Sequence, residues 1–216
     1  MSKQEIKTSP NRLLEILRFG FFGAIGFGIG STIAVPIASI MFQSFLYGLI
    51  GVPFILFIAG MAGSALLGIA VSDKSKTKRL ILNSSLGLFF GFYISYFVIT
   101  PLIFNGLNWT SQLVIIWMLI GAIGGAMMGL ALKSRIATIT LALIGATGFA
   151  IGEFVYLELH LTFINYMILK YGKNVFKDIF TQIIGRVVES FIVLSIGGAS
   201  LGLTLGYLKT KEKIEK

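Results

Sequence analysis

The chain has 216 residues, of which 56% are hydrophobic and 12% are charged, and its mean hydropathy is +0.90. Because soluble domains carry about a quarter of their residues charged, this composition excludes an ordinary soluble domain and is typical of an integral membrane protein. The chain lacks cysteine and has one histidine, His160, which excludes a disulfide framework, thiolate chemistry and a multi-histidine metal site. We therefore expect no metal and no cofactor.

Long uncharged runs predict an all-α fold with six transmembrane helices. A helix crosses the hydrocarbon layer in about 20 residues, and the run from Phe19 to Ser72 has 54 residues without a charge. Such a run must fold back on itself, and Phe42–Gly48 is the expected turn. The runs do not alternate every second residue, as the strands of a transmembrane β-barrel would. The predicted spans are residues 19–41, 50–72, 80–103, 113–132, 136–157 and 187–208.

The basic residues predict which side of the membrane each loop faces. Fourteen of the 18 Lys and Arg residues fall in segment 1–18, in the second and fourth loops, and in the tail 209–216. Because Lys and Arg concentrate on the cytoplasmic side, we expect both termini in the cytoplasm. Segment 1–18 is expected to be retained, since the apolar run after it is too long for a signal peptide. We expect the plasma membrane of a prokaryote as the location.

The net charge of +9 has the same origin as this asymmetry. We expect the lipid bilayer as the main partner, with anionic lipids at the cytoplasmic face, and we exclude nucleic acid. Partner membrane proteins or further copies of the chain stay open as possibilities.

One string recurs at the end of each even-numbered span. It reads GSALLGIAV from Gly63, GGAMMGLAL from Gly124 and GGASLGLTL from Gly197. The odd-numbered spans share a second marker, two glycines four residues apart, which begins at Gly26, Gly87 and Gly148. Both markers return after 61 residues between the first two units. Two independent markers with one spacing predict three copies of a two-helix hairpin.

The expected repeat units are residues 12–74, 75–134 and 135–209, within a transmembrane domain of residues 19–208. Each unit starts and ends on the same side, so the repeats are parallel and predict a pseudo-threefold axis along the membrane normal. Within the unit the two markers lie 37 residues apart in the first two copies and 49 in the third. The third copy thus has 12 extra residues, and segment 161–184 predicts an amphipathic helix at the outer interface.

Small residues recur every four positions on the even-numbered spans. Since lipid gives helices no hydrophobic reason to associate, small residues that let backbones approach closely are the usual contact points. The expected packing residues are Gly60, Ser64, Gly68, Gly121, Gly125, Gly129, Gly198, Gly202 and Gly206.

Ionisable residues within or beside the spans are the candidate functional residues, because such groups in a membrane usually face a partner or a cavity. They are Glu153, Glu158, His160, Arg186 and Glu189, and all five belong to the third unit. We expect Glu153 to face inward and to pair with Arg186. The group is either a structural ion pair or a site for a transported solute.

An enzyme is not expected. One string, GASLG at Gly198–Gly202, matches G-x-S-x-G. That motif requires a strand before its serine and a histidine within reach, whereas Ser200 lies inside a predicted spanning helix. The match is a by-product of the repeated string.

Two functions remain, and their structural requirements differ. The first is a non-enzymatic helical bundle that acts as a packing scaffold or as a subunit of a membrane assembly. The second is a small-solute transporter or channel that uses the third-unit charges. A filled core with an exposed small-residue face favours assembly, and a buried polar site lined by Glu153 favours transport.

The predicted topology is testable with reporter fusions. Reporters inserted after Lys213 or between Asp73 and Arg79 are expected to be cytoplasmic, and one near Asn108 external, because the basic residues are divided fourteen to four. A reporter such as alkaline phosphatase, active only outside the cytoplasm, makes the measurement. An external C-terminus would contradict the count of six spans.

Overall fold

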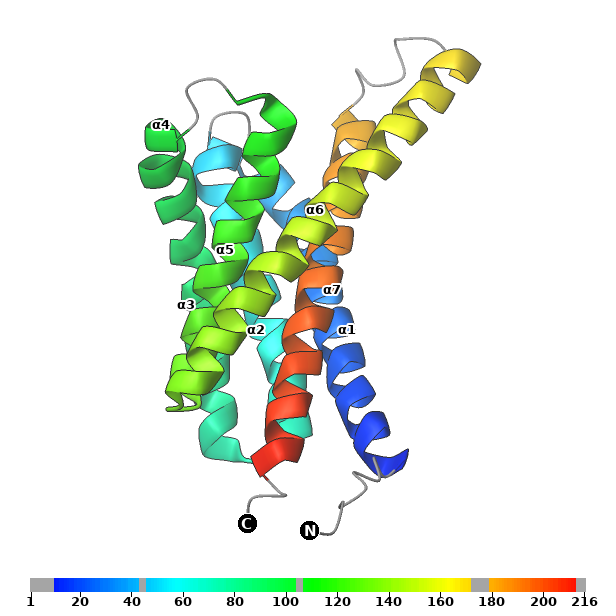
Figure 1. Ribbon diagram of the computed structural model, residues 1–216. Helices are drawn as coiled ribbons and strands as arrows, with labels where there is room; N and C mark the ends of the chain where they lie inside the picture. Colours follow the sequence, from blue (N-terminus) through cyan, green and yellow to red (C-terminus); the bar gives the residue numbers. More distant parts are fainter. Residues whose placement is uncertain (1–9, 43–45, 104–106, 172–178, 213–216) are drawn as a thin grey trace.

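The computed structural model describes residues 10–42, 46–103, 107–171 and 179–212; within these, the side chains at 10–11, 103, 163–171, 179–181 and 212 are not described. All regular structure in these ranges is helical (Figure 1). The α-helices are α1 (Pro10–Met41), α2 (Val52–Val71), α3 (Lys74–Tyr93), α4 (Thr100–Ile103), α5 (Trp109–Ala131), α6 (Arg135–Tyr171) and α7 (Ile179–Glu212). Two π-helical segments, η1 (Tyr47–Gly51) and η2 (Ile94–Ile99), precede α2 and follow α3.

Six helical stretches in the described residues are long and apolar enough to cross a membrane. They are Arg12–Met41, Tyr47–Val71, Lys74–Leu102, Trp109–Ala131, Arg135–Thr162 and Gln182–Lys211. Each predicted span lies inside one of these stretches to within one residue. The helices are longer than the predicted spans because hydropathy detects only their apolar part, whereas polar turns such as Lys74–Arg79 are helical too.

Residues 161–171, where the sequence predicted the start of a separate amphipathic helix, are part of α6. The helix α6 runs without interruption through Tyr171. Residues 172–178, and the side chains of 163–171 and 179–181, lie outside the described part of the chain. The amphipathic face predicted for residues 161–184 therefore stays a prediction.

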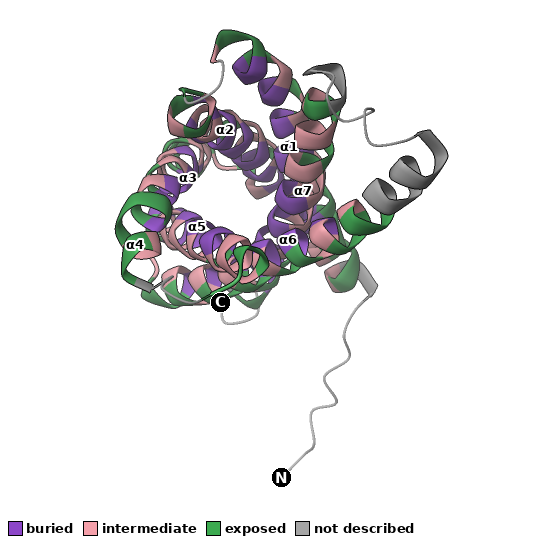
Figure 2. Cartoon of the chain, turned by 90° about the horizontal axis from the view of Figure 1, so that it is seen from above, coloured by how far each residue is buried: buried purple, intermediate pink, exposed green. Residues whose placement is uncertain are grey.

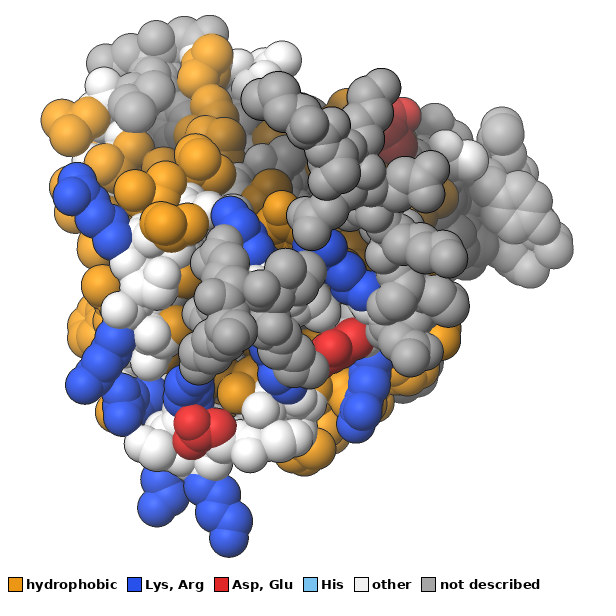
Figure 3. Space-filling view, turned by 60° about the horizontal axis from the view of Figure 1, so that its bottom comes forward, with side chains coloured by type: hydrophobic (Ala, Val, Ile, Leu, Met, Phe, Trp, Pro, Cys, Tyr) orange, Lys and Arg blue, Asp and Glu red, His pale blue; other side chains and the backbone are white. Residues whose placement is uncertain are grey.

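The helices form a ring. Each packs against its neighbours in the chain, in the order α1, α2, α3, α5, α6, α7, and an extensive contact between α1 and α7 closes the circle (Figure 2). The start of α1, the end of α7 and the α2–α3 and α5–α6 connections lie at one end of the bundle (Figure 1). We call it the basic end, because Lys and Arg side chains cover much of it (Figure 3).

The two connections at the basic end are built alike. Each begins with a residue in the left-handed conformation, Ser72 (φ 61°) and Lys133 (φ 56°). The next residue caps the following helix: Asp73 Oδ1 accepts from the N–H of Ser75 at 2.9 Å, and Ser134 Oγ accepts from the N–H of Ala137 at 3.2 Å. These caps satisfy N–H groups that would otherwise lack partners, so the short turns are stable without a long loop.

Glycines set the distance between the two helices of each hairpin. A Cβ atom added to Gly26, Gly87 or Gly148 would lie 2.7 Å, 3.1 Å or 3.5 Å, respectively, from the Cα of a glycine on the next long helix. The three glycine pairs are Gly26 with Gly63, Gly87 with Gly124, and Gly148 with Gly197. The two backbones therefore lie in direct contact.

The interfaces between hairpins also depend on small residues. A Cβ at Gly125 would overlap the carbonyl oxygen of Leu141 on α6, and one at Gly202 would overlap that of Phe19 on α1. At the α2–α3 contact, a Cβ at Gly60 would lie 2.9 Å from the Cα of Ser85. These small-residue faces are thus occupied within the bundle.

Residues 61 positions apart in the sequence are buried in sets of three. The first set is Phe27, Leu88 and Phe149, all 0% exposed. The second set is Ser31, Phe92 and Glu153, and the third is Ala34, Ser95 and Tyr156; all six are buried. Leu67, Met128 and Leu201, on the last parts of the even-numbered spans, are buried too. Most of these apolar side chains belong to one continuous core.

Gly125→Leu and Gly202→Leu are expected to lower the thermal stability of the detergent-solubilised protein by roughly 3 kcal/mol or more, or about 6–12 °C, because the new side chain displaces a backbone. The measurement is a thermal unfolding curve. Gly185→Leu is the matched control, since nothing lies within 4 Å of a Cβ at Gly185. Equal unfolding temperatures for all three variants would contradict the importance of close contact at Gly125 and Gly202.

Candidate functional site

Glu153 is a fully buried carboxyl group without a hydrogen-bond partner. It lies on α6, its side chain is 0% exposed, and neither Oε1 nor Oε2 has a partner among the described residues. It lies one helical turn from the core residue Phe149. Burying a polar group without hydrogen bonds is costly, and burying an unpaired charge is more so. Burying Glu153 in this way therefore lowers the stability of the folded protein.

Two further groups surround Glu153. Glu189, on α7, is partly buried and lies within electrostatic range of Glu153. Tyr156 is one turn after Glu153 on α6, is 7% exposed, and lies within electrostatic range of both carboxyls. We call Glu153, Glu189 and Tyr156 the carboxyl cluster. It combines two acids and a phenol in the part of the bundle farther from the basic end.

Arg186 does not make the ion pair that the sequence suggested. Its guanidinium lies 3.9 Å from the centre of the Tyr47 ring, as a cation–π contact, and Glu153 has no hydrogen-bond partner. The expected pairing was wrong, because the planar guanidinium stacks on the aromatic ring that η1 presents to α7. Arg186 stays within electrostatic range of Glu189, at the edge of the carboxyl cluster.

The other two candidates have different positions. His160 lies one turn beyond Tyr156, and its Nδ1 is 3.1 Å from the Tyr156 hydroxyl, so it joins the carboxyl cluster through that contact. Glu158 is exposed and lies on another face of α6. The structure thus brings together Glu153, Glu189 and, at the margin, Arg186 and His160, but not Glu158.

Two buried hydroxyl groups, the Oγ atoms of Ser95 and Ser195, also have no hydrogen-bond partner among the described residues. Ser95 belongs to η2, and a Cβ at Gly28 would overlap the Ser195 hydroxyl. Buried polar atoms normally find a hydrogen-bond partner, so these hydroxyl groups, like the Glu153 carboxyl, call for an explanation.

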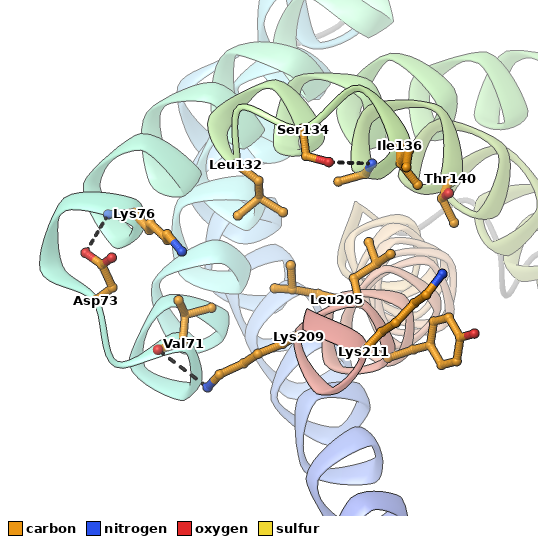
Figure 4. Close-up of a pocket in the computed structure, with 13 residues that line it drawn as sticks. Val71, Asp73, Lys76, Leu132, Ser134, Ile136, Thr140, Leu205, Lys209 and Lys211 are labelled. Atoms are coloured by element: carbon orange, nitrogen blue, oxygen red, sulfur yellow. Dashed lines mark hydrogen bonds between the residues drawn. The ribbon is translucent and has the colours of Figure 1, made fainter. Parts of the chain in front are cut away.

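A cavity of about 700 Å³ opens at the basic end. Its wall comes from α2, α3, α6 and α7 and from the α2–α3 and α5–α6 connections, and Val71, Leu132 and Leu205 are among its apolar residues (Figure 4). Its charged lining residues are Asp73, Lys76, Lys209 and Lys211, and Ser134, Thr140 and Tyr207 add hydroxyl groups.

Two of the charged groups at the cavity have structural roles. The Lys209 ammonium donates to the carbonyl oxygen of Ala70 at 2.9 Å and lies 3.7 Å from the Glu15 carboxylate. The N–H of Lys76, with that of Ser75, lowers the pKa of the Asp73 carboxyl below its usual range. A lowered pKa means that this cap stabilises the fold above the ordinary carboxyl pKa and is lost as the pH falls through the lowered value. Asp73 is therefore ionised at neutral pH.

Sequence reasoning missed both Tyr156 and the cavity. Tyr156 is not among the candidates drawn from the sequence, although its position three residues after Glu153 places it on the same helix face. The lysines that line the cavity were interpreted only as markers of topology. No sequence signal distinguishes a lysine at a cavity from one on a loop.

Within the described ranges, no group of three or more His, Cys, Asp or Glu residues is arranged to hold a metal ion. Neither a family model, nor a curated protein, nor a solved structure matched the chain. The chemistry of the site must therefore be inferred from its own geometry.

Glu153→Leu is expected to raise the thermal stability by about 1–3 kcal/mol, because leucine has a similar size and removes a buried polar group that no hydrogen bond satisfies. Thermal unfolding in detergent measures the change. Glu158→Leu, at an exposed position on the same helix, should leave the unfolding temperature nearly unchanged. A lower unfolding temperature for Glu153→Leu would mean that the carboxyl is a structural group.

Proposed function

We propose that the protein is an integral membrane protein made of three parallel two-helix hairpins around a pseudo-threefold axis, with the basic end in the cytoplasm. The hairpins are α1 with α2, α3 with α5, and α6 with α7. Support comes from residues at equivalent places in the three units, which make equivalent contacts. Gly30 lies against Ala59, Gly91 against Ile120 and Gly152 against Val193. The two helices of each hairpin are thus aligned with each other in the same way in all three hairpins.

The connections between hairpins support the same proposal. Ser72 and Lys133, with their left-handed backbones, are 61 residues apart, as are the caps Asp73 and Ser134. At the start of α3 and of α6, Gly68 lies against Thr77, and Gly129 against Thr138. One local structure thus recurs at the interval that the sequence markers define.

The α1–α7 interface departs from this register by one helical turn. By the repeat spacing, Gly202 corresponds to Gly129, and Ile16 corresponds to Thr138. In the structure, however, a Cβ at Gly202 meets Phe19, and it is Gly206 that lies against Ile16. No short connection joins α1 to α7, so this interface is free to adopt a different register. The departure occurs beside the third unit, which also contains the carboxyl cluster.

We propose that this bundle is a small-solute transporter rather than a packing scaffold. The scaffold required small-residue faces that await a partner, whereas in the structure those faces contact other helices of the same chain. The observation that carries the proposal is Glu153, a carboxyl group with 0% exposure and no hydrogen-bond partner. An ionisable residue kept unpaired within a spanning helix is typical of ion and proton pathways.

The proposed path runs along the centre of the ring. In this structure the basic end holds the cavity lined by Val71, Leu132 and Leu205, and buried core residues such as Phe27, Leu88 and Phe149 occupy the rest of the bundle. In this proposal the conformation described here is one state of an alternating-access cycle. In the other state the basic end closes and the opposite end opens. Short turns hold the α2–α3 and α5–α6 interfaces in place, whereas no turn joins α1 to α7. In this proposal the α1–α7 interface is therefore the one that shifts during the cycle.

In this proposal the carboxyl cluster binds the coupling ion. Two carboxyl groups within electrostatic range of each other in a low-dielectric interior repel each other when both are ionised, and a proton or a bound cation reduces the repulsion. The ion thus has a larger affinity for states in which Glu153 and Glu189 stay together. Differential affinity of this kind is what allows a ligand to shift a conformational equilibrium.

Single-thiol labelling tests the transport cycle. Because the chain lacks cysteine, Ser95→Cys introduces its sole thiol at a position that is 0% exposed here. We expect a membrane-impermeant thiol reagent to label it from the side opposite the basic end, since the alternate state opens that half. We also expect Glu153→Gln in the same background to change the labelling rate several-fold. Mass spectrometry of protein in sealed vesicles measures both.

Two exposed positions calibrate the accessibility of each side. Lys78→Cys should react only from the basic side, and Thr110→Cys only from the other. If Ser95→Cys stays unlabelled from both sides while the denatured protein reacts fully, the interior does not open. That result would reject transport and favour a static scaffold.

A further inference from the structure

The backbone around Glu153 offers hydrogen-bond acceptors rather than donors. The side chain is 0% exposed, and neither carboxyl oxygen has a hydrogen-bond partner among the described residues. An ionised carboxylate can only accept hydrogen bonds, whereas a protonated carboxyl can also donate one. Within a regular helix the N–H groups are already used, while each carbonyl oxygen keeps a second lone pair. Because Glu153 lies inside α6, its backbone surroundings favour the neutral acid.

Hydroxyl groups elsewhere in the bundle use these carbonyl lone pairs. Ser31, which precedes Glu153 by two of the 61-residue intervals, donates its hydroxyl to the carbonyl oxygen of Gly28 at 2.7 Å. On α7, Thr204 donates to the carbonyl oxygen of Ser200 at 2.9 Å. A protonated Glu153 can make the same kind of bond to the preceding turn of α6, and an ionised Glu153 cannot.

The two acids of the carboxyl cluster differ in their electrostatic surroundings. Arg186 lies within electrostatic range of Glu189, and a positive charge favours the ionised form of a carboxyl. The charged neighbour of Glu153 is Glu189, a like charge that disfavours ionisation of both acids at once. Tyr156, on the same face of α6, is bonded to His160. The helix α5, which also packs against α6, has no charged residue in Trp109–Ala131. A single proton in this cluster is therefore most stable on Glu153.

A metal cation would need a different arrangement of oxygens. Hard cations such as Na⁺ are coordinated by several oxygens that converge on one point, and in transporters some of these are carbonyl oxygens of unwound helices. Here α6 and α7 are regular α-helices at Glu153 and Glu189. Their carbonyl oxygens point along the helix axes and do not converge between the two acids. A proton needs one oxygen atom and no coordination shell.

We propose that the coupling ion is a proton and that Glu153 carries it, as a neutral acid in the conformation described here. The inference rests on the proposed transport function, for which it names the ion of the carboxyl cluster. In the alternate state water reaches Glu153, its O–H bond breaks, and the proton passes to water while the carboxylate becomes hydrated. Closure buries the carboxyl again and requires that a proton first returns to it, since burying the charge is costly. This requirement couples the proton to the conformational cycle.

Infrared spectroscopy detects the proton directly, because the C=O stretching band of a neutral carboxyl lies apart from the bands of a carboxylate. With the full-length protein in detergent at neutral pH, we expect this band in the parent and its loss in Glu153→Gln. Glutamine has nearly the shape of the neutral acid, so this variant should unfold close to the temperature of the parent. Glu189→Gln and the exposed control Glu158→Gln should both retain the band. Exchanging choline chloride for sodium or potassium chloride at equal ionic strength should change neither the band nor the unfolding temperature.

A parent spectrum without the band, or a band that Glu189→Gln removes and Glu153→Gln keeps, would overturn Glu153 as the proton carrier. Stabilisation by Na⁺ or K⁺ in the parent but not in Glu153→Gln would show that the ion is a metal cation. These results are separate from the transport test, since the band is measured at equilibrium and opening by thiol labelling of Ser95→Cys. A protein that has the band but never exposes Ser95→Cys would keep its neutral acid as a structural group, and coupling would be rejected together with transport.

Discussion

Direct contact between helix backbones is the constraint on which the rest of the structure depends. Each hairpin is held by a glycine of one helix against a glycine of the next, and at α5–α6 and α7–α1 a glycine lies against a carbonyl oxygen of the neighbouring backbone. Close approach brings many weak dispersion contacts into range, and these are the main attraction available between apolar helices in lipid. Because the ring is so tightly joined at its circumference, its interior has to be filled by a small number of large side chains, notably Phe27, Leu88 and Phe149.

The carboxyl cluster and the basic-end cavity lie in different parts of the bundle and carry opposite charges. One places buried acids and unsatisfied hydroxyls in the half of the bundle that is closed, and the other places donors and positive charge at the end that is open. The unpaired carboxyl of Glu153 does not stabilise the fold, whereas Lys209 and Asp73 at the cavity do. Ionisable groups inside a membrane protein usually face a partner or a cavity, which is why Glu153 is the strongest functional candidate.

The sequence predicted the helices well and the site only in part. Six spans follow from length and hydropathy, and the inward orientation of Glu153 followed from its place in the third unit. The position of Arg186 did not, since a guanidinium has two good alternatives, a carboxylate or an aromatic face, and the choice depends on where η1 places Tyr47. The cavity was equally unpredictable, because its wall combines helices that are distant in the sequence. Periodicity carries information about one helix, whereas a site depends on several.

The closure of the ring by α1 and α7 has a consequence for biosynthesis. The helix α1 leaves the ribosome well before α7, and each presents glycines that the other covers. At ordinary elongation rates, on the order of ten to thirty seconds separate the completion of α1 from that of α7. During that interval α1 can pair with α2 but its second face stays uncovered. The growing chain is therefore an open arc, and any other protein with a small-residue face that arrives within that interval competes with α7 for the same surface.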